Sequence, residues 1–287
     1  MGSIPPRLHL SHLANRTILL VGGSTMRMMA TDLMMQTHRT QMAAFGEGTA
    51  LRRQLTCPSS WRVAVHPCDA LRGFGCTNCV CCCGPNCARR RAEEATNISN
   101  AANWKNLFFG WSDFTATCSS YSLRLDFSWK PEMHTADDDA AFNTRFCASS
   151  AQQYDIAIIG KGLHDVMFRP APLGAFVARL VSEVAALGAL VQCLPQSTSL
   201  MVRTPYWVDD DLGKRPRRST TGLLVATADI VRAAVASGRF GRRAQLIDAF
   251  ALTRGQEGAL RSYDGIHYPP LLQMAVWDMV MSKAVGE

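Results

Sequence analysis

The chain has 287 residues, of which 47% are hydrophobic and 18% charged, so it is long and apolar enough to bury a full core. Thirty basic and 23 acidic residues leave a net charge of +7, and the excess is partly clustered in Arg89–Arg91, Lys214–Arg218 and Arg239–Arg243. We interpret these runs as solvated loops, with an acidic glycan, an anionic lipid surface or nucleic acid as alternatives. Phe240 is the one aromatic residue within these runs, and this scarcity argues against nucleic acid.

No run of eighteen apolar residues occurs, so we expect no membrane span. Residues 1–15 lack the apolar core of a signal peptide. The protein is therefore expected in the cytoplasm or, if an upstream targeting segment is missing from this sequence, in the secretory pathway (Golgi lumen or extracellular). We expect residues 1–16 to form an N-terminal arm and residues 17–287 to form one domain.

The first half of the chain predicts strands and one long helix. Residues 17–21 form the first predicted strand, and a methionine-rich helix follows from Thr25 to about Phe45, with its methionines packed in the core. Further strands are predicted at 61–65, 107–111 and 122–129. The last of these alternates apolar with polar residues, so we expect one of its faces to be only partly covered.

The second half alternates strands with helices. Residues 155–160 form the clearest interior strand, and 189–194 predict another. The predicted helices are 173–187, 223–236, 243–252 and a last helix opened by Pro269 and Pro270, whose apolar face would run through Leu271, Met274, Ala275 and Met279. This alternation predicts an α/β domain with a parallel sheet covered on both faces.

Eight of the eleven cysteines fall between Cys57 and Cys87, in a Gly- and Pro-containing stretch without periodicity. We expect a Cys-rich loop insertion at about 57–88. The spacing of Cys76, Cys79, Cys83 and Cys87 suits a tetrahedral zinc site, a disulfide-stapled loop or free thiols, and these alternatives stay open.

Two distant segments carry groups suited to acyl transfer. Ser24 follows the first predicted strand and two glycines, where a helix would begin, so its hydroxyl and its backbone N–H would face the same way. His267 lies in a late loop, three residues after Asp264. We predict that Ser24 is a nucleophile, that His267 accepts its proton and that Asp264 orients the imidazole. A helix N-cap is the structural alternative for Ser24.

An acyl-transfer site also needs donors for the oxyanion of its tetrahedral intermediate. We expect the Ser24 N–H to be one donor and the Gly160–His164 loop to supply a second, with a third near Gly110. His164 is a site candidate whose alternative is a buried structural histidine. The sequence has no Gly-x-Ser-x-Gly elbow, which argues against the α/β-hydrolase family.

Three ordered motifs carry a family resemblance: Gly22-Gly23-Ser24-Thr25-Met26-Arg27, Gly162-Leu163-His164-Asp165 and Asp264-Gly265-Ile266-His267. They resemble the Gly-Asp-Ser-x-x-Arg, Gly-Leu-His-Asp-like and Asp-Gly-x-His blocks of the SGNH/GDSL hydrolase superfamily, and its PC-esterase-like branch in particular. That branch includes trichome-birefringence-like proteins, neurexophilin-and-PC-esterase proteins and the catalytic domain of sialic-acid O-acetyltransferases.

The resemblance spans roughly residues 17–280. It implies a flavodoxin-like three-layer α/β/α sandwich and a serine acyl-enzyme that needs no cofactor or metal. It further implies removal or transfer of acetyl groups on a glycan or related small ester. It places Gly23, Gly162, His164 and Arg27 at the site. Gly23 stands where the family has aspartate, so a weak or inactive binding protein is one alternative function, and a zinc-binding interaction module around Cys76–Cys87 is another.

Overall fold

The fold is a seven-stranded mixed sheet between two layers of helices, seen in a computed structural model of the full chain. The strands are β1 Thr17–Gly22, β2 Trp61–His66, β3 Asp113–Cys118, β4 Leu123–Trp129, β5 Ile156–Gly160, β6 Ser199–Arg203 and β7 Gln245–Ile247. The structure describes residues 10–35, 61–66, 113–130, 142–147, 153–169, 171–208, 221–256 and 266–285.

The strand order is β2-β3-β4-β1-β5-β6-β7. Strands β4, β1, β5, β6 and β7 are parallel, whereas β2 and β3 extend the β4 edge in antiparallel pairing. Counted among themselves in chain order, the five parallel strands therefore lie in the order 2-1-3-4-5, which is the flavodoxin-like order. Ligands of such sheets bind beyond the carboxyl ends of the strands where the order reverses, which here is between β1 and β5.

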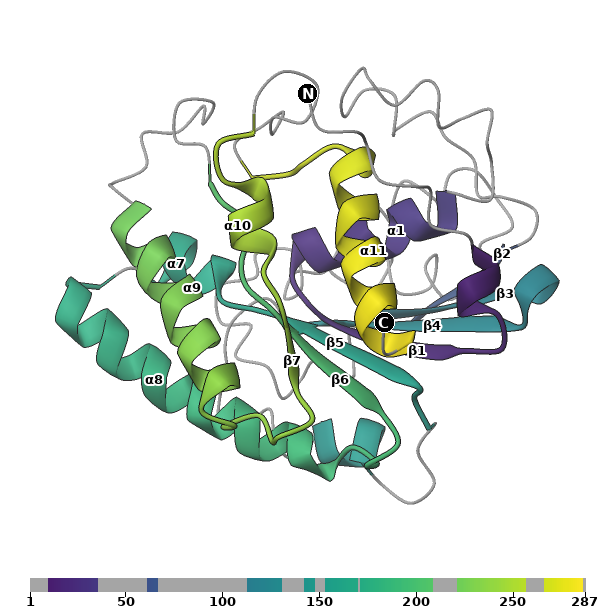
Figure 1. The fold of residues 1–287 in the computed structure, drawn as a ribbon, viewed down its shortest axis with the longest axis horizontal. Helices are drawn as coiled ribbons and strands as arrows, with labels where there is room; N and C mark the ends of the chain where they lie inside the picture. The colour runs from purple at the N-terminus through teal and green to yellow at the C-terminus, as the bar shows by residue number, and fades with distance from the viewer. Residues whose placement is uncertain are drawn as a thin grey trace, which may run out of the picture.

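Helices cover both faces of this sheet. They are α1 Ser24–Met35, α7 Leu163–Phe168, α8 Leu173–Leu190, α9 Thr221–Ala236, α10 Ala249–Thr253 and α11 Pro270–Val285. Shorter turns are η1 Leu10–Leu13, η4 Ser119–Tyr121, the π-helical η5 Asn143–Cys147 and η6 Val191–Cys193. Figure 1 shows α8 and α9 along one side of the sheet and α1 and α11 on the other.

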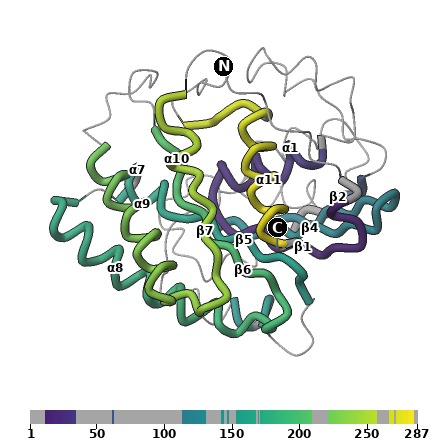
Figure 2. Tube along the Cα trace, in the orientation of Figure 1, coloured from purple at the N-terminus to yellow at the C-terminus, as the bar shows by residue number. Residues whose placement is uncertain are grey.

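Strand β1 shows why the sheet needs two covering layers. Ile18 and Leu20 pack into the core cluster shared by α1 and α11, whereas Leu19 and Val21 pack into the cluster shared by α8 and α9. Successive side chains of a strand point to opposite faces, so both faces of an apolar strand have to be covered. The predicted three-layer α/β/α sandwich is confirmed. The tube of Figure 2 shows α1 and α11, from opposite ends of the chain, side by side.

The predicted methionine packing of the first helix is confirmed within α1. Met26, Met29 and Met34 are completely buried, and Met28 is nearly so. The predicted strands at 17–21, 61–65, 122–129 and 155–160 correspond to β1, β2, β4 and β5, and the helices at 173–187 and 223–236 to α8 and α9. Leu13, within the predicted arm, is completely buried.

Two predictions of local structure are wrong. The predicted strand 189–194 forms the end of α8 and η6, because Leu187, Leu190, Val191 and Leu194 are spaced as one helical face and all lie in the same core cluster. An apolar run this short has no periodicity that separates a strand from a buried helix. The predicted helix 243–252 is divided into β7 and α10, and β3 and β6 were not predicted.

Two burial predictions are confirmed only in part. On the polar face of β4 the Arg124 side chain is 39% exposed, whereas Asp126 and Ser128 are buried. Asp126 accepts hydrogen bonds from Tyr154 and Thr115 at 2.9 and 2.6 Å. Helix α11 buries Leu272, Val276, Trp277 and Val280. Of its predicted face, Met274 is buried, Ala275 and Met279 are half-buried, and Leu271 is exposed. This helix is apolar almost all round, so a packing contact decides its rotation: Trp277 Nε1 donates to the Met29 carbonyl at 3.0 Å.

A disulfide that the sequence did not predict joins Cys147 of η5 to Cys193 of η6, with their Cα atoms 5.5 Å apart. The segment Leu173–Cys193 is long and apolar enough to cross a membrane by length and composition alone. Here Phe176, Leu180 and Val184 are buried in the second core cluster, as expected for a core helix. The Cys-rich stretch lies outside the described residues except for Trp61–His66, which form β2, and so does the predicted strand 107–111.

Candidate active site

Ser24 lies at the start of α1, directly beyond the carboxyl end of the central strand β1. The carbonyl of Gly23 accepts the N–H groups of Met26 and Arg27, each at 3.1 Å, so Gly23 is the residue that begins the helix. The N–H groups at the start of a helix have no acceptor within it and carry its positive dipole. The Ser24 hydroxyl therefore stands next to amide donors that can stabilise a developing negative charge.

Glycines at the ends of two neighbouring strands allow this arrangement. Gly22 of β1 is paired with Gly160 of β5. A Cβ atom on Gly22 would lie 2.2 Å from the Gly160 carbonyl oxygen, and one on Gly160 would lie 2.4 Å from the Met26 sulfur. The first turn of α1 can approach both strands only because neither residue has a side chain.

His267 lies against Ser24, although 243 residues separate them. The distance from Ser24 Oγ to His267 Nε2 is 3.0 Å, which is hydrogen-bonding distance. In the tautomer protonated at Nδ1, Nε2 accepts the serine proton, and this is the relation that a general base requires. Both side chains are half-buried, so the pair is sheltered yet open to a ligand.

Tyr268, the next residue, anchors the His267 loop. Its side chain is 1% exposed, and its hydroxyl oxygen lies 3.0 Å from the Trp207 carbonyl oxygen and 3.3 Å from that of Thr253. The Trp207 N–H in turn donates to Thr253 Oγ1 at 2.8 Å. The loop after β6 and the end of α10 therefore hold the residue next to the base.

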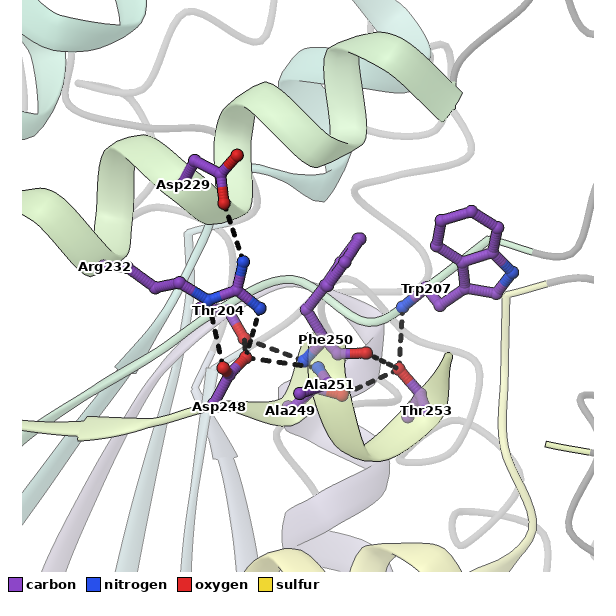
Figure 3. A network of polar contacts seen from close by, with 9 residues as sticks. All are labelled: Thr204, Trp207, Asp229, Arg232, Asp248, Ala249, Phe250, Ala251 and Thr253. Carbon is purple, nitrogen blue, oxygen red and sulfur yellow. Dashed lines mark hydrogen bonds and ion pairs between the residues drawn. The ribbon is translucent and has the colours of Figure 1, made fainter. Parts of the chain in front are cut away.

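Figure 3 shows the polar network that holds the loop after β6 and helix α10 in place. Arg232 of α9 donates Nε and Nη2 to the two oxygens of Asp248 at 3.0 and 2.9 Å, and Asp248 caps α10 through the Ala251 N–H. Thr204, just after β6, donates to Asp248 at 3.2 Å and accepts the Phe250 N–H at 2.8 Å. The network ties β6, α9 and α10 together behind the His267 loop.

His164, in the first turn of α7, lies close to Ser24 and His267. It is 9% exposed, its ring packs edge-on against Trp129 at 5.8 Å, and Arg27 lies over the Trp129 ring at 5.2 Å. Burial and the neighbouring charges of His267 and Arg27 lower the pKa of His164 to about 4. His164 is therefore neutral at pH 7 and can donate one hydrogen bond without carrying a charge.

The structure thus brings together Ser24, His267, His164, Gly23 and Arg27 from the predicted set. Gly162 is also here: it has a φ of 98° and begins α7, directly before the segment that carries His164. This backbone conformation is strained for residues with a Cβ atom, which explains a glycine at this position. Asp264 and Gly110 lie outside the described residues, so their predicted roles remain predictions.

Three buried basic side chains at this edge of the sheet were not predicted: Lys130, Lys161 and Arg203 are 6%, 5% and 1% exposed. Lys130 and Lys161 each follow directly after a strand, β4 and β5, and that position was the available signal in the sequence. Arg203 ends β6, a strand that the sequence did not reveal. Across the described ranges, no three His, Cys, Asp or Glu side chains are grouped to hold a metal. The predicted zinc ligands lie beyond those ranges.

No protein-family model and no curated protein matches the chain. Among solved structures, the acetylxylan esterase Axe2 from Geobacillus stearothermophilus is similar with a TM-score of 0.41 and 12% identity, over 96% of this chain and 95% of that one. LAE5, an alpha/beta hydrolase enzyme from the metagenome of Lake Arreo, Spain, has a TM-score of 0.40 and 14% identity, over 97% and 98% of the two chains.

Proposed function

We propose that the protein is a serine-dependent O-acyl esterase or O-acetyltransferase that acts on an acylated glycan or a related ester through an acyl-enzyme. The observation that carries this proposal is the 3.0 Å distance between Ser24 Oγ and His267 Nε2 at the carboxyl edge of a parallel sheet. A serine that only capped α1 would need no imidazole at its hydroxyl. The ordered sequence motifs support membership of the SGNH superfamily and its PC-esterase-like branch.

The first half of the reaction follows from the residues in place. Ser24 Oγ attacks the ester carbonyl while His267 Nε2 takes the hydroxyl proton. The carbonyl oxygen becomes an oxyanion that accepts hydrogen bonds from the Ser24 N–H and the loop before His164. The carbon–oxygen bond to the alcohol then breaks, the alcohol oxygen takes the proton from His267, and the acyl group stays on Ser24.

The second half returns the enzyme to its starting state. Water or a sugar hydroxyl gives a proton to His267 and attacks the acyl-serine. As the acyl–oxygen bond to Ser24 breaks, His267 donates that proton to Ser24 Oγ. Neutral His164 is positioned to donate a hydrogen bond to the oxyanion or the substrate, because its low pKa keeps it uncharged at pH 7. Asp264 would hold His267 in the tautomer that accepts the serine proton.

The test compares hydrolysis of p-nitrophenyl acetate by the wild-type protein, Ser24→Ala and His267→Ala. We expect each variant to lower kcat/KM by about 10³-fold or more. Ser282→Ala removes an exposed hydroxyl on α11 and serves as the matched control, with activity unchanged. Turnover by Ser24→Ala equal to that of the wild type rejects the proposal. Acetate release compared with transfer to an added sugar acceptor separates esterase from transferase.

Gly23, in the place of the family's aspartate, motivates the second candidate, a non-catalytic protein that binds a glycan in the same cleft. Gly23 is buried, and its carbonyl already completes the first turn of α1 without a side chain. Activity that is present only in Gly23→Asp supports this binding role. Full, Ser24-dependent activity of the unaltered chain excludes it.

A further inference from the structure

The pocket next to the nucleophile has a cationic lining. Besides Ser24 itself, its walls are Gly23, Thr25, Gly160, Lys161, Leu163, His164, Arg203 and Pro205. Lys161 and Arg203 are the charged side chains in this set, and both carry positive charge. No carboxylate from the described part of the chain lines the pocket. A site for a neutral ester alone needs donors to one carbonyl oxygen and has no need for two buried cations.

Arg203 presents buried hydrogen-bond donors beside this pocket. Its side chain is 1% exposed, its guanidinium lies 4.2 Å above the Tyr206 ring, and its Nη2 donates to Thr25 Oγ1 at 2.7 Å. Its Nε and Nη1 atoms are buried and have no hydrogen-bond partner among the described residues. Arginine stays protonated in proteins, and buried donors on a charged group are costly unless something accepts from them. Nε borders Gly160, another wall of the pocket.

Arg27, which is 7% exposed, adds positive charge to the same edge. Lys130, which is 6% exposed, adds little charge at pH 7, because burial and the Lys161 ammonium lower the pKa of Lys130 to about 6. The N-terminus of α1 contributes its dipole at Ser24. Like charges gathered in a low-dielectric site repel, so this arrangement favours a bound anion.

The buried carboxylates next to this edge are engaged by their own donors. Asp113 accepts the Trp129 N–H at 2.5 Å and the Ser128 hydroxyl at 3.3 Å, and Asp165 pairs with Arg169 at 3.0 Å.

We propose that Lys161 and Arg203 form a subsite for a carboxylate of the substrate, next to the ester that Ser24 attacks. The substrate class is then an O-acylated hydroxy acid or sugar acid. This inference rests on the proposed acyl transfer for its reaction, but the subsite itself does not depend on turnover. Lys161 and Arg203 bind the carboxylate in the alcohol part of the ester, and that part leaves with its carboxylate when the acyl group moves to Ser24.

The kinetic test uses two esters that differ only in charge, sodium 2-acetoxypropanoate and 2-acetoxypropanamide. We expect kcat/KM for the carboxylate to exceed that for the amide by about 10-fold or more, as a charge-assisted contact in a buried site provides. In Lys161→Met this ratio falls toward one, whereas Lys283→Met, a change at the end of α11, leaves the ratio unchanged. A ratio near one in the wild type, or a ratio that Lys161→Met preserves, overturns the subsite.

A binding test with the inactive variant Ser24→Ala separates the subsite from the reaction. At equal ionic strength, sodium lactate is expected to raise Tm by about 2–4 °C at saturating concentrations, whereas lactamide with sodium chloride does not. The lactate effect is expected to disappear when Lys161→Met is added. Selective stabilisation by lactate without Ser24-dependent turnover rejects the proposed function and keeps the subsite. Equal effects of lactate and lactamide reject the subsite, even where the esterase is active.

Discussion

His164 makes the stability of the fold depend on pH in a range that can be calculated. Burial, with the charges of His267 and Arg27, lowers the pKa of His164 from 6.5 to about 4 in the folded protein. The unfolded chain binds a proton at this histidine below about pH 6.5, whereas the folded chain does so only near pH 4. Stability is therefore fully present above pH 6.5 and is lost as the pH falls toward 4.

The size of the effect follows from the two pKa values. At pH 5 the unfolded histidine is almost fully protonated and the folded one is almost fully neutral, so the linkage costs ~2 kcal/mol relative to pH 7. We expect His164→Gln to remove this dependence, because glutamine does not titrate. Any packing lost against Trp129 is independent of pH and shifts both measurements equally.

The assay is urea unfolding of the wild type and His164→Gln at pH 7 and pH 5. The wild type should lose ~2 kcal/mol more of its unfolding free energy than the variant over this interval. His12→Gln, which replaces an exposed histidine, is the control and should follow the wild type. Equal losses in the wild type and His164→Gln refute the conclusion that His164 is held neutral.

Two further predictions concern groups at opposite ends of the sheet. Burial and the Lys161 ammonium lower the pKa of Lys130 to about 6. The unfolding free energy of the wild type, measured by urea titration, should therefore rise between pH 6 and pH 10 by up to ~1.4 kcal/mol per pH unit relative to that of Lys130→Met. The same pH dependence in both proteins would contradict this. The disulfide between Cys147 and Cys193 closes a loop with a sequence separation of 46, so replacing both cysteines with serine should cost about 4 kcal/mol in unfolding free energy without reductant. An unchanged urea midpoint in that double variant would show that the crosslink does not constrain the unfolded chain.

The sequence predicted elements well where the signal is local. The apolar runs at 17–21 and 155–160 form β1 and β5, because a strand buried on both faces needs an unbroken apolar run. The methionine pattern predicted a core helix, and α1 buries those methionines. Short elements were missed or misassigned, including β3, β6 and β7, since three to six residues carry too little periodicity to identify an element.

The site shows the same division between local and distant information. Ser24 after a strand and a glycine pair, and His267 in a late loop, could be selected as candidates from residue type and position alone. That their side chains lie 3.0 Å apart depends on the sheet order, which places β1 at the centre, and on the packing of Tyr268 against the β6 and α10 segments. No local pattern in the sequence predicts the distance between these two side chains.

By itself, the amino-acid sequence identified Ser24 and His267 as candidate site residues, the unbroken apolar runs that form β1 and β5, and the longer helices. The tertiary structure alone decided that Lys130, Lys161 and Arg203 gather beside Ser24, because each follows or ends a different strand and only parallel pairing brings those ends to one edge. It also decided the charge states of His164 and Lys130, since the free energy of ionisation depends on burial and on neighbouring charges contributed by distant parts of the chain.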